Sequence, residues 1–151
     1  MLGLVLGGCF SEGTCLVTAT NVMEIQFKKK TSTSTDSVMT FTSITINGSI
    51  TSTDTVINSL LLLPVDIHHD TTMFVMKRFN NDYTVTGTDT LVVTYSRQSK
   101  VITRDCGAYT FYDKLRIVKT SIDSAQIKVL STSLVKDPTS SAYAINYQIY
   151  Y

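Results

Sequence analysis

The sequence predicts an all-β protein, an antiparallel two-sheet sandwich of about seven to nine strands with an immunoglobulin-like general architecture. Two observations predict this class. Thr and Ser together supply 40 of the 151 residues, whereas Glu occurs only twice and Trp is absent. β-Branched Thr suits a pleated, half-exposed strand, while Glu is a natural residue of exposed helices. In addition, apolar residues recur at every second position along much of the chain, and no segment keeps a helical apolar period.

Residues 22–28 form the first expected strand, because Met23, Ile25 and Phe27 fall on one face and polar residues on the other. Residues 31–37 contain no apolar side chain and are expected to form a solvated loop. The consecutive lysines between these segments are interpreted as the end of the strand and not as a phosphate site.

A hairpin is expected around Asn47-Gly48, which lies between two β-prone runs, residues 38–46 and 49–57. Both turn positions tolerate a positive φ, which makes this pair a strong hairpin signal. The leucines at 60–63 then predict a buried strand, and the proline that follows must end it, bend it or place it at an edge.

The rest of the chain predicts further strands separated by polar turns. Residues 90–104 are expected to form either one long bent strand or a hairpin. The other expected strands cover residues 71–79, 83–86, 109–120, 122–134 and 143–151. A chain of this length fits a single hydrophobic core, so one domain is expected.

The charges nearly cancel, with 13 basic and 12 acidic residues. No net field therefore draws the protein toward nucleic acid, which is not expected as a partner.

Residues 1–6 are apolar and lead into Leu6-Gly7-Gly8-Cys9. This order resembles a bacterial lipobox, in which a signal peptidase cuts before a cysteine that carries diacylglycerol. The apolar run has no basic start and is shorter than the roughly 7–15 residues of a secretory signal, so a buried first strand is the alternative. The resemblance implies lipidation of Cys9 and a membrane attachment. It divides the chain into a signal remnant (1–8), a lipidated N-terminus and tether (9–21) and a sandwich domain (22–151).

Three cysteines leave one over in an exported protein. If Cys9 carries the lipid, Cys15 and Cys106 remain as an even pair. A disulfide between them would close a loop of about 90 residues and stabilise the fold by about 4–5 kcal/mol. The alternative is two buried free thiols. No cysteine lies near the histidines, so neither a metal nor another cofactor is expected.

His68 and His69, flanked by Asp66 and Asp70, are the residues that suggest chemistry. They could form a metal site or a general base with its orienting carboxylate. Adjacent strand residues point to opposite faces, however, and no third ligand follows at a recognisable spacing. We interpret this segment as a polar turn, with a metal-dependent activity at the two histidines as the alternative.

The last expected strand carries a tyrosine stripe, because Tyr143, Tyr147 and Tyr151 share one face of it. Such a stripe could form a stacking platform for a sugar or a peptide. The alternative, which is the more common outcome, is a terminal strand that packs its tyrosines on the core.

Three features occur together: the Cys9/Cys15 opening, the leucine run broken by Pro64, and the stretch from Tyr95 through Arg104-Asp105-Cys106-Gly107-Ala108-Tyr109. In this combination the chain resembles a family of small Bacteroidota lipoproteins that has no functional assignment. The resemblance implies an envelope lipoprotein with a β-sandwich body and no established chemistry.

Five of the ten aspartates are followed by Ser or Thr and then by a small or aliphatic residue. This pattern resembles the O-glycan acceptor of exported Bacteroidota proteins. It implies that the candidate acceptors are Ser37, Thr55, Thr71, Thr90 and Ser124. The alternative is that Asp-Ser/Thr starts strands after turns, where the aspartate accepts backbone N–H bonds.

The expected function is that of a non-enzymatic, lipid-anchored envelope protein that binds an envelope protein or glycan, or gives structural support. The alternative is a carbohydrate- or peptide-binding module that uses the tyrosine stripe. Glu12 is the only acidic residue shortly after Cys9, so the outer membrane is expected to hold the protein on its periplasmic face and not at the cell surface.

Overall fold

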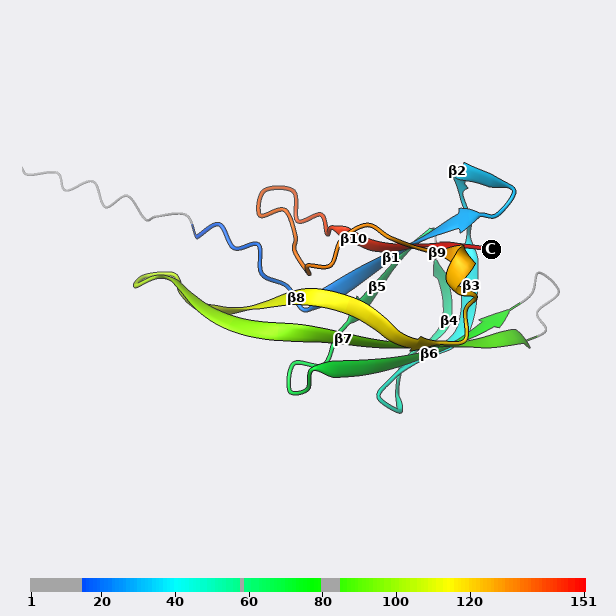
Figure 1. Ribbon diagram of the computed structural model, residues 1–151, viewed down its shortest axis with the longest axis horizontal. Coiled ribbons are helices and arrows are strands. Elements are labelled where there is room, and N and C mark those ends of the chain that lie inside the picture. The colour runs from blue at the N-terminus through cyan, green and yellow to red at the C-terminus, as the bar shows by residue number, and fades with distance from the viewer. Residues whose placement is uncertain (1–14, 58, 80–84) are drawn as a thin grey trace, which may run out of the picture.

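The computed structural model describes residues 15–57, 59–79 and 85–151, and it confirms the all-β sandwich (Figure 1). Ten strands are described, slightly more than expected, and β2 lies in a segment that was expected to be a loop. The strands are β1 (Val22–Lys29), β2 (Ser32–Asp36), β3 (Met39–Ile46), β4 (Ser49–Ile57), β5 (Leu60–Pro64), β6 (Thr71–Phe79), β7 (Val85–Thr103), β8 (Gly107–Thr120), β9 (Ile127–Val129) and β10 (Ile145–Tyr150). A 3-10 turn, η1 (Ser124–Gln126), precedes β9, and no helix in the described ranges has the length and apolarity needed to cross a membrane.

The first sheet is built around β1. One edge of β1 pairs with β10, which in turn pairs with β9. On the other edge, β5 covers the N-terminal half of β1 and β2 covers the C-terminal half. The β1–β10 pair is parallel, which differs from the expected antiparallel arrangement, because the chain returns to the first strand only after completing the second sheet.

The second sheet has the order β4-β3-β6-β7-β8, and every pair in it is antiparallel. The predicted hairpin at Asn47-Gly48 is confirmed, since it joins β3 to β4 with φ values of 48° and 86° at the two turn residues. Both values lie in the left-handed region that Gly and Asn adopt at low cost.

β7 is one long strand of 19 residues, which resolves the choice between a long strand and a hairpin at residues 90–104. The short strand expected at 83–86 is not separate, because β7 begins at Val85 and continues through Gly87; residues 80–84 lie outside the described ranges. β6 pairs with β7 only as far as Thr94, so beyond Tyr95 β7 pairs with β8 alone. This two-stranded extension, residues 96–113, is called the ribbon below, and it projects past the other strands (Figure 1).

The core lies between the two sheets. β6 alternates as expected, with its buried side chains on the face that meets the first sheet. The fully buried large side chains include Tyr147, Phe27, Phe41, Phe74, Met23, Ile25, Leu63, Met76, Leu91, Leu115, Leu134 and Ile149. Burial of each such side chain contributes roughly 1.5–3 kcal/mol.

The leucine run at 60–63 is only half buried, which corrects the expected buried strand. Leu61 and Leu63 are 4% and 2% exposed, whereas Leu60 and Leu62 are 45% and 46% exposed. The reason is that β5 belongs to one sheet of a two-sheet sandwich, so alternate side chains face the core and the solvent.

Two further segments differ from expectation. Residues 31–37, expected as a loop, contain β2, which lies beside β1 where Lys28 and Asp36 form an ion pair. Residues 122–134, expected as one strand, keep only β9. The buried Asn146 side chain explains this difference, because its Nδ2 donates to the carbonyls of Ser131 at 3.2 Å and Ser133 at 3.0 Å and holds that stretch as a turn.

Candidate functional site

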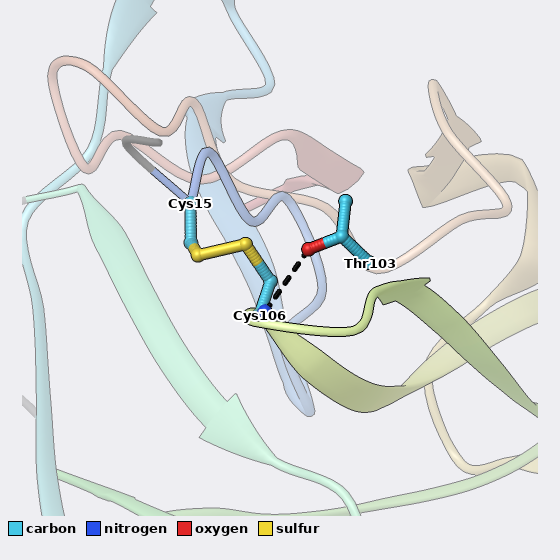
Figure 2. Close-up of a disulfide and its surroundings, with 3 residues drawn as sticks. All are labelled: Cys15, Thr103 and Cys106. Carbon is cyan, nitrogen blue, oxygen red and sulfur yellow. Dashed lines mark hydrogen bonds between the residues drawn. A yellow bond between two sulfur atoms is a disulfide. The ribbon is translucent and has the colours of Figure 1, made fainter. Parts of the chain in front are cut away.

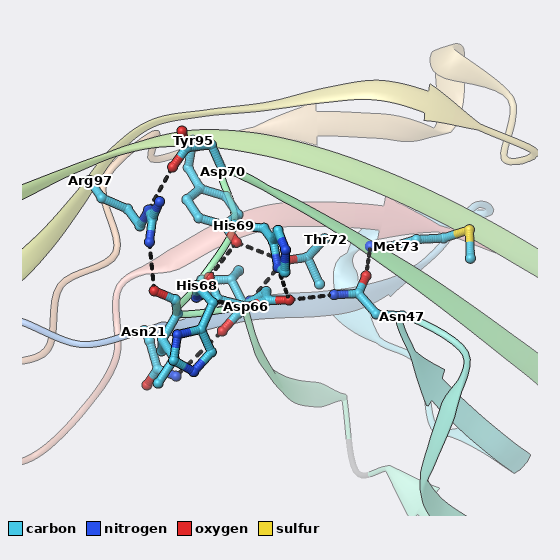
Figure 3. Close-up of polar contacts among 12 residues, drawn as sticks. Asn21, Asn47, Asp66, His68, His69, Asp70, Thr72, Met73, Tyr95 and Arg97 are labelled. Atoms are coloured by element: carbon cyan, nitrogen blue, oxygen red, sulfur yellow. Dashed lines mark hydrogen bonds and ion pairs between the residues drawn. The ribbon is translucent and has the colours of Figure 1, made fainter.

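The loop between β5 and β6 is organised around Asp66 (Figure 3). Its Oδ2 atom accepts hydrogen bonds from Asn47 Nδ2 at 2.8 Å and from His69 Nδ1 at 2.9 Å. Its Oδ1 atom accepts from the His68 backbone N–H at 2.8 Å. The His68 N–H and then the His69 ring lower the pKa of Asp66 to about 2, because both stabilise the charged carboxylate. At neutral pH the Asp66 carboxylate is therefore an anion that holds its own loop together.

The two histidines do not converge on one site. Only the His69 ring contacts Asp66, while His68 contributes its backbone N–H. The His69 side chain is 74% exposed, and Asp66 is its one ion-pair partner within the described ranges. Over residues 15–57, 59–79 and 85–151, no group of three or more His, Cys, Asp or Glu side chains could hold a metal ion. His68 and His69 lie in the loop that joins β5 to β6, where the polar turn was expected.

A closed ring of buried and partly buried hydrogen bonds fixes the same loop to the second sheet. The Asp66 N–H donates to Thr72 Oγ1 at 2.8 Å, and the Tyr95 hydroxyl donates to the Asp66 carbonyl at 2.6 Å. The Thr72 and Tyr95 hydroxyls lie 2.8 Å apart, and Thr72 is the donor because the Tyr95 proton is already engaged. Thr72 and Tyr95 are 0% and 5% exposed, and burial raises the pKa of Tyr95. These polar groups thus serve the fold of the loop.

A surface hollow of about 380 Å³ lies beside this loop, over β6, β7 and β8. The groups that could meet a ligand there are Thr71, Thr94, Ser96, Lys114 and Arg116. Arg116 Nε donates to Thr94 Oγ1 at 3.2 Å, and no described carboxylate forms an ion pair with Lys114 or Arg116. Two uncompensated cations among hydroxyl groups can bind a small anion or an acidic group.

The one carboxylate at the hollow is already paired. Asp70 Oδ1 accepts from Arg97 Nε at 2.6 Å, and Arg97 also donates to the Ile67 carbonyl at 2.7 Å. The Asp70 hydrogen bond raises the pKa of the Arg97 guanidinium further. Asp70 is therefore held by Arg97 at the rim, away from an ion pair with the two cations.

Sequence reasoning did not single out Lys114 and Arg116. Their approach to Thr94 and Ser96 depends on a register shift between β7 and β8 at Thr94/Ser96 and on a positive φ of 57° at Lys114. A bulge of this kind changes which side chains share a face. The residue types in this stretch do not indicate a register shift. The hollow therefore could not be predicted from the periodicity of the sequence.

The disulfide expected from the cysteine count is present between Cys15 and Cys106, whose Cα atoms are 5.6 Å apart (Figure 2). Cys106 lies in the turn between β7 and β8, and its N–H donates to Thr103 Oγ1 at 3.0 Å. The disulfide therefore fastens the start of the described chain to the end of the ribbon. Cys9, the expected lipidation site, lies outside the described residues.

The segment after Cys15 is also fixed by the body of the protein. The Thr18 carbonyl accepts from the Lys136 N–H at 3.0 Å, and Ala19 forms a β-bridge with Val135. Only residues 16 and 17 separate these contacts from the disulfide-bonded Cys15.

Tyr147 of the tyrosine stripe packs on the core, which is the favoured outcome for this strand, and the stripe does not form an exposed platform. Tyr147 is 0% exposed and belongs to the core; burial raises its pKa to about 12, and its hydroxyl has no hydrogen-bond partner among the described residues. Tyr151 is half buried, and its hydroxyl donates to Asp89 Oδ2 at 2.8 Å. Tyr143 lies outside β10, in a bridge with Lys136. The alternative of tyrosines packed on the core is the correct one for Tyr147.

The candidate acceptor hydroxyls differ in exposure. Thr71 and Ser124 are exposed, Ser37 and Thr90 are half buried, and the Thr55 side chain lies outside what the structure describes. Asp123 Oδ1 accepts the Ala125 N–H at 3.0 Å, which is the capping role that the alternative reading of these triplets assigns to aspartate.

Comparison with known proteins assigns the family. Residues 35–151 match a family of unknown function, DUF6452. The chain belongs to this family. The DUF6452 match begins inside β2 and includes the hollow, the ribbon and Cys106, whereas β1 and Cys15 precede it. No curated protein and no solved structure matches the chain. The expectation of a family without assigned function is confirmed, and DUF6452 membership names no activity.

Proposed function

We propose that the protein is a lipid-anchored protein of the bacterial cell envelope, attached through Cys9, which acts by binding or by structural support and not by catalysis. The observation that carries this proposal is the disulfide between Cys15 and Cys106. Disulfides persist in oxidising compartments such as the periplasm. Because this pair uses two of the three cysteines, Cys9 remains for the lipid that the lipobox resemblance implies.

The position of the disulfide supports a body that lies close to the membrane. Five residues, 10–14, separate Cys9 from Cys15. Even fully extended, this tether reaches only about 20 Å. With Glu12 as its only acidic residue, we assign the protein to the periplasmic face of the outer membrane of a Bacteroidota cell.

A binding or structural role is supported by the polar groups of the β5–β6 loop, which form hydrogen bonds within the loop and to its neighbouring strands. The Asp66 carboxylate, which contacts the His69 ring, also accepts hydrogen bonds from Asn47 Nδ2 and from the His68 backbone N–H, so it fixes the loop as well as the ring. The Tyr95 and Thr72 hydroxyls beneath it bond to each other and to the Asp66 backbone. These hydrogen bonds stabilise the conformation of the loop.

The test is intact-mass analysis of protein purified from membranes of its host under non-reducing conditions. We expect the mass of a diacylated or triacylated chain that starts at Cys9 and holds the Cys15–Cys106 bond. A Cys9→Ser variant should lose both the added mass and membrane association, while a Cys15→Ser variant, as the matched control, should keep them. A native chain without acyl groups would refute the anchor.

We further propose O-glycosylation of at least one of the five triplet hydroxyls, with Thr71 and Ser124 as the first candidates because both are exposed. Glycan mass added to the host-purified protein, and lost in a Thr71→Val/Ser124→Ala variant, is the expected result. A native mass that equals the bare lipidated chain would contradict it.

A second candidate function is the binding of a small anion or acidic group in the hollow, which the unpaired Lys114 and Arg116 favour. Inorganic phosphate, titrated while backbone amide signals are followed by NMR, is the probe. We expect shifts confined to the hollow that disappear in Lys114→Ala and Arg116→Ala variants. A Lys119→Ala variant, which removes a neighbouring exposed cation outside the hollow, is the control. Equal loss in all three variants would indicate general charge attraction and refute the site.

A further inference from the structure

The end of the ribbon, residues 100–109, exposes apolar side chains and is called the ribbon tip below. Val101 is 74% exposed, the highest exposure among the large apolar residues described, and Ile102 is 38% exposed. Leu16, which is 57% exposed, follows Cys15 directly and is thus held at the same place by the disulfide. Single exposed apolar residues are ordinary, but three at one projecting end of a small domain are not accounted for by folding.

Basic and aromatic residues accompany these apolar side chains. Lys100 pairs with Tyr109 across the ribbon, and its Nζ atom lies 5.2 Å from the centroid of the Phe111 ring. Arg104 is exposed in the turn, next to one acidic residue, Asp105. Basic residues thus lie on both sides of the apolar pair, with Lys100 before it and Arg104 in the turn beyond it. Apolar side chains flanked by basic and aromatic residues are typical of protein segments at a membrane surface.

The ribbon tip also has the shape that such a contact needs. From Ser96 to Thr103, β7 pairs with β8 alone, so the tip extends beyond both sheets and no described strand covers it (Figure 1). The β7–β8 pairing shifts register between Val101 and Thr103, so Ile102 lies at an irregularity next to the exposed Val101. A lipid headgroup layer can surround a projecting end of this kind and cover both side chains.

We propose that the ribbon tip inserts into the headgroup region of a phospholipid membrane and sets the orientation of the sandwich on it. This inference rests on the proposed lipid anchor. The disulfide places the tip at the residue that the short tether from Cys9 reaches. A weak contact so close to an anchor becomes effectively intramolecular, so it needs little affinity of its own. A lipid chain combined with an apolar and basic patch gives a membrane attachment with a defined orientation.

The absence of Trp from the chain allows a direct test. Val101→Trp and Val38→Trp variants each introduce one fluorophore at a similarly exposed valine, 74% and 64% exposed. Val38 lies between β2 and β3, away from the ribbon, and is the matched control. Each full-length lipoprotein, purified from membranes, is reconstituted into vesicles of phosphatidylcholine with phosphatidylglycerol, with and without bromine-labelled acyl chains.

We expect a blue-shifted emission and several-fold stronger bromine quenching for Val101→Trp than for Val38→Trp. Quenching of Val101→Trp should fall when phosphatidylglycerol is omitted and when Lys100→Gln and Arg104→Gln are added, because each basic residue near an anionic surface strengthens attraction. Equal quenching of the two valine variants, or none in either, overturns the inference and leaves a protein partner as the occupant of the tip. The intact mass of the same samples reports acylation separately, so failure of the anchor and failure of the tip contact are distinguishable.

Discussion

Removal of the Cys15–Cys106 disulfide tests how much of the stability depends on the fixed N-terminal segment. The bond closes a loop with a sequence separation of 91 residues. In the chain-entropy model, a loop of that length raises the free energy of unfolding by about 4–5 kcal/mol when the native ends are already in place.

The figure is smaller when the native ends are held together by the backbone contacts that follow Cys15. The Thr18 carbonyl and the Ala19 bridge hold the chain three and four residues after Cys15. Closing a native stretch of three residues instead of an unfolded loop of 91 residues leaves a net gain of (3/2)RT ln(91/3), which is about 3 kcal/mol. We therefore expect a Cys15→Ala/Cys106→Ala variant to lose about 3 kcal/mol.

The assay is urea unfolding followed by circular dichroism, in a Cys9→Ser background that prevents thiol exchange. The oxidised parent should become as unstable as the double alanine variant when a reductant is added, and the variant itself should not respond to the reductant. A loss below about 1 kcal/mol would show that residues 18–21 move freely in the reduced protein, which would refute the reasoning. A loss near 5 kcal/mol would show instead that Cys15 is positioned without the bond.

Three further substitutions test other features. Asp66→Asn should lower stability at neutral pH, because an amide keeps only one of the two oxygens that accept these hydrogen bonds. Since the pKa of Asp66 is lowered to about 2, its contribution should be complete above about pH 4 and lost as the pH falls toward about 2, so unfolding curves of parent and variant should converge there. Tyr147→Phe should raise the free energy of unfolding by about 1 kcal/mol, since it removes a buried hydroxyl without a partner; a loss would reveal a bond to that hydroxyl. Leu61→Ala should cost about 2–4 kcal/mol and Leu62→Ala less than about 1 kcal/mol in urea unfolding, and equal costs would contradict the half-buried β5.

The sequence was sufficient for the local features of this fold. Period-two alternation located most strands, and Asn47-Gly48 specified the β3–β4 hairpin, because each of these signals depends on neighbouring residues only. The cysteine count identified the disulfide partners, since three thiols and one lipid leave one pair.

Features that depend on distant partners were not predictable. Alternation shows that a strand has two faces and does not show which face is covered, so Leu62 was expected to be buried and Tyr147 was left open as a surface residue. The side chain of Asn146 holds residues 131–133 in a turn after β9. This residue lies later in the chain, so the segment itself gives no sign of the turn. Lys114 and Arg116 come together at the hollow only through a register shift between two strands.

The parallel pairing of β1 with β10 has a consequence for biosynthesis. The backbone N–H of Glu24 bonds to the side chain of Asn146, 122 residues later. While the chain is being synthesised, one edge of β1 has no β10 partner until nearly the whole domain is available, and an open strand edge attracts other chains. Contacts of such long range also form slowly. The first sheet is therefore completed last, and the β1 edge that β10 later covers stays open until then.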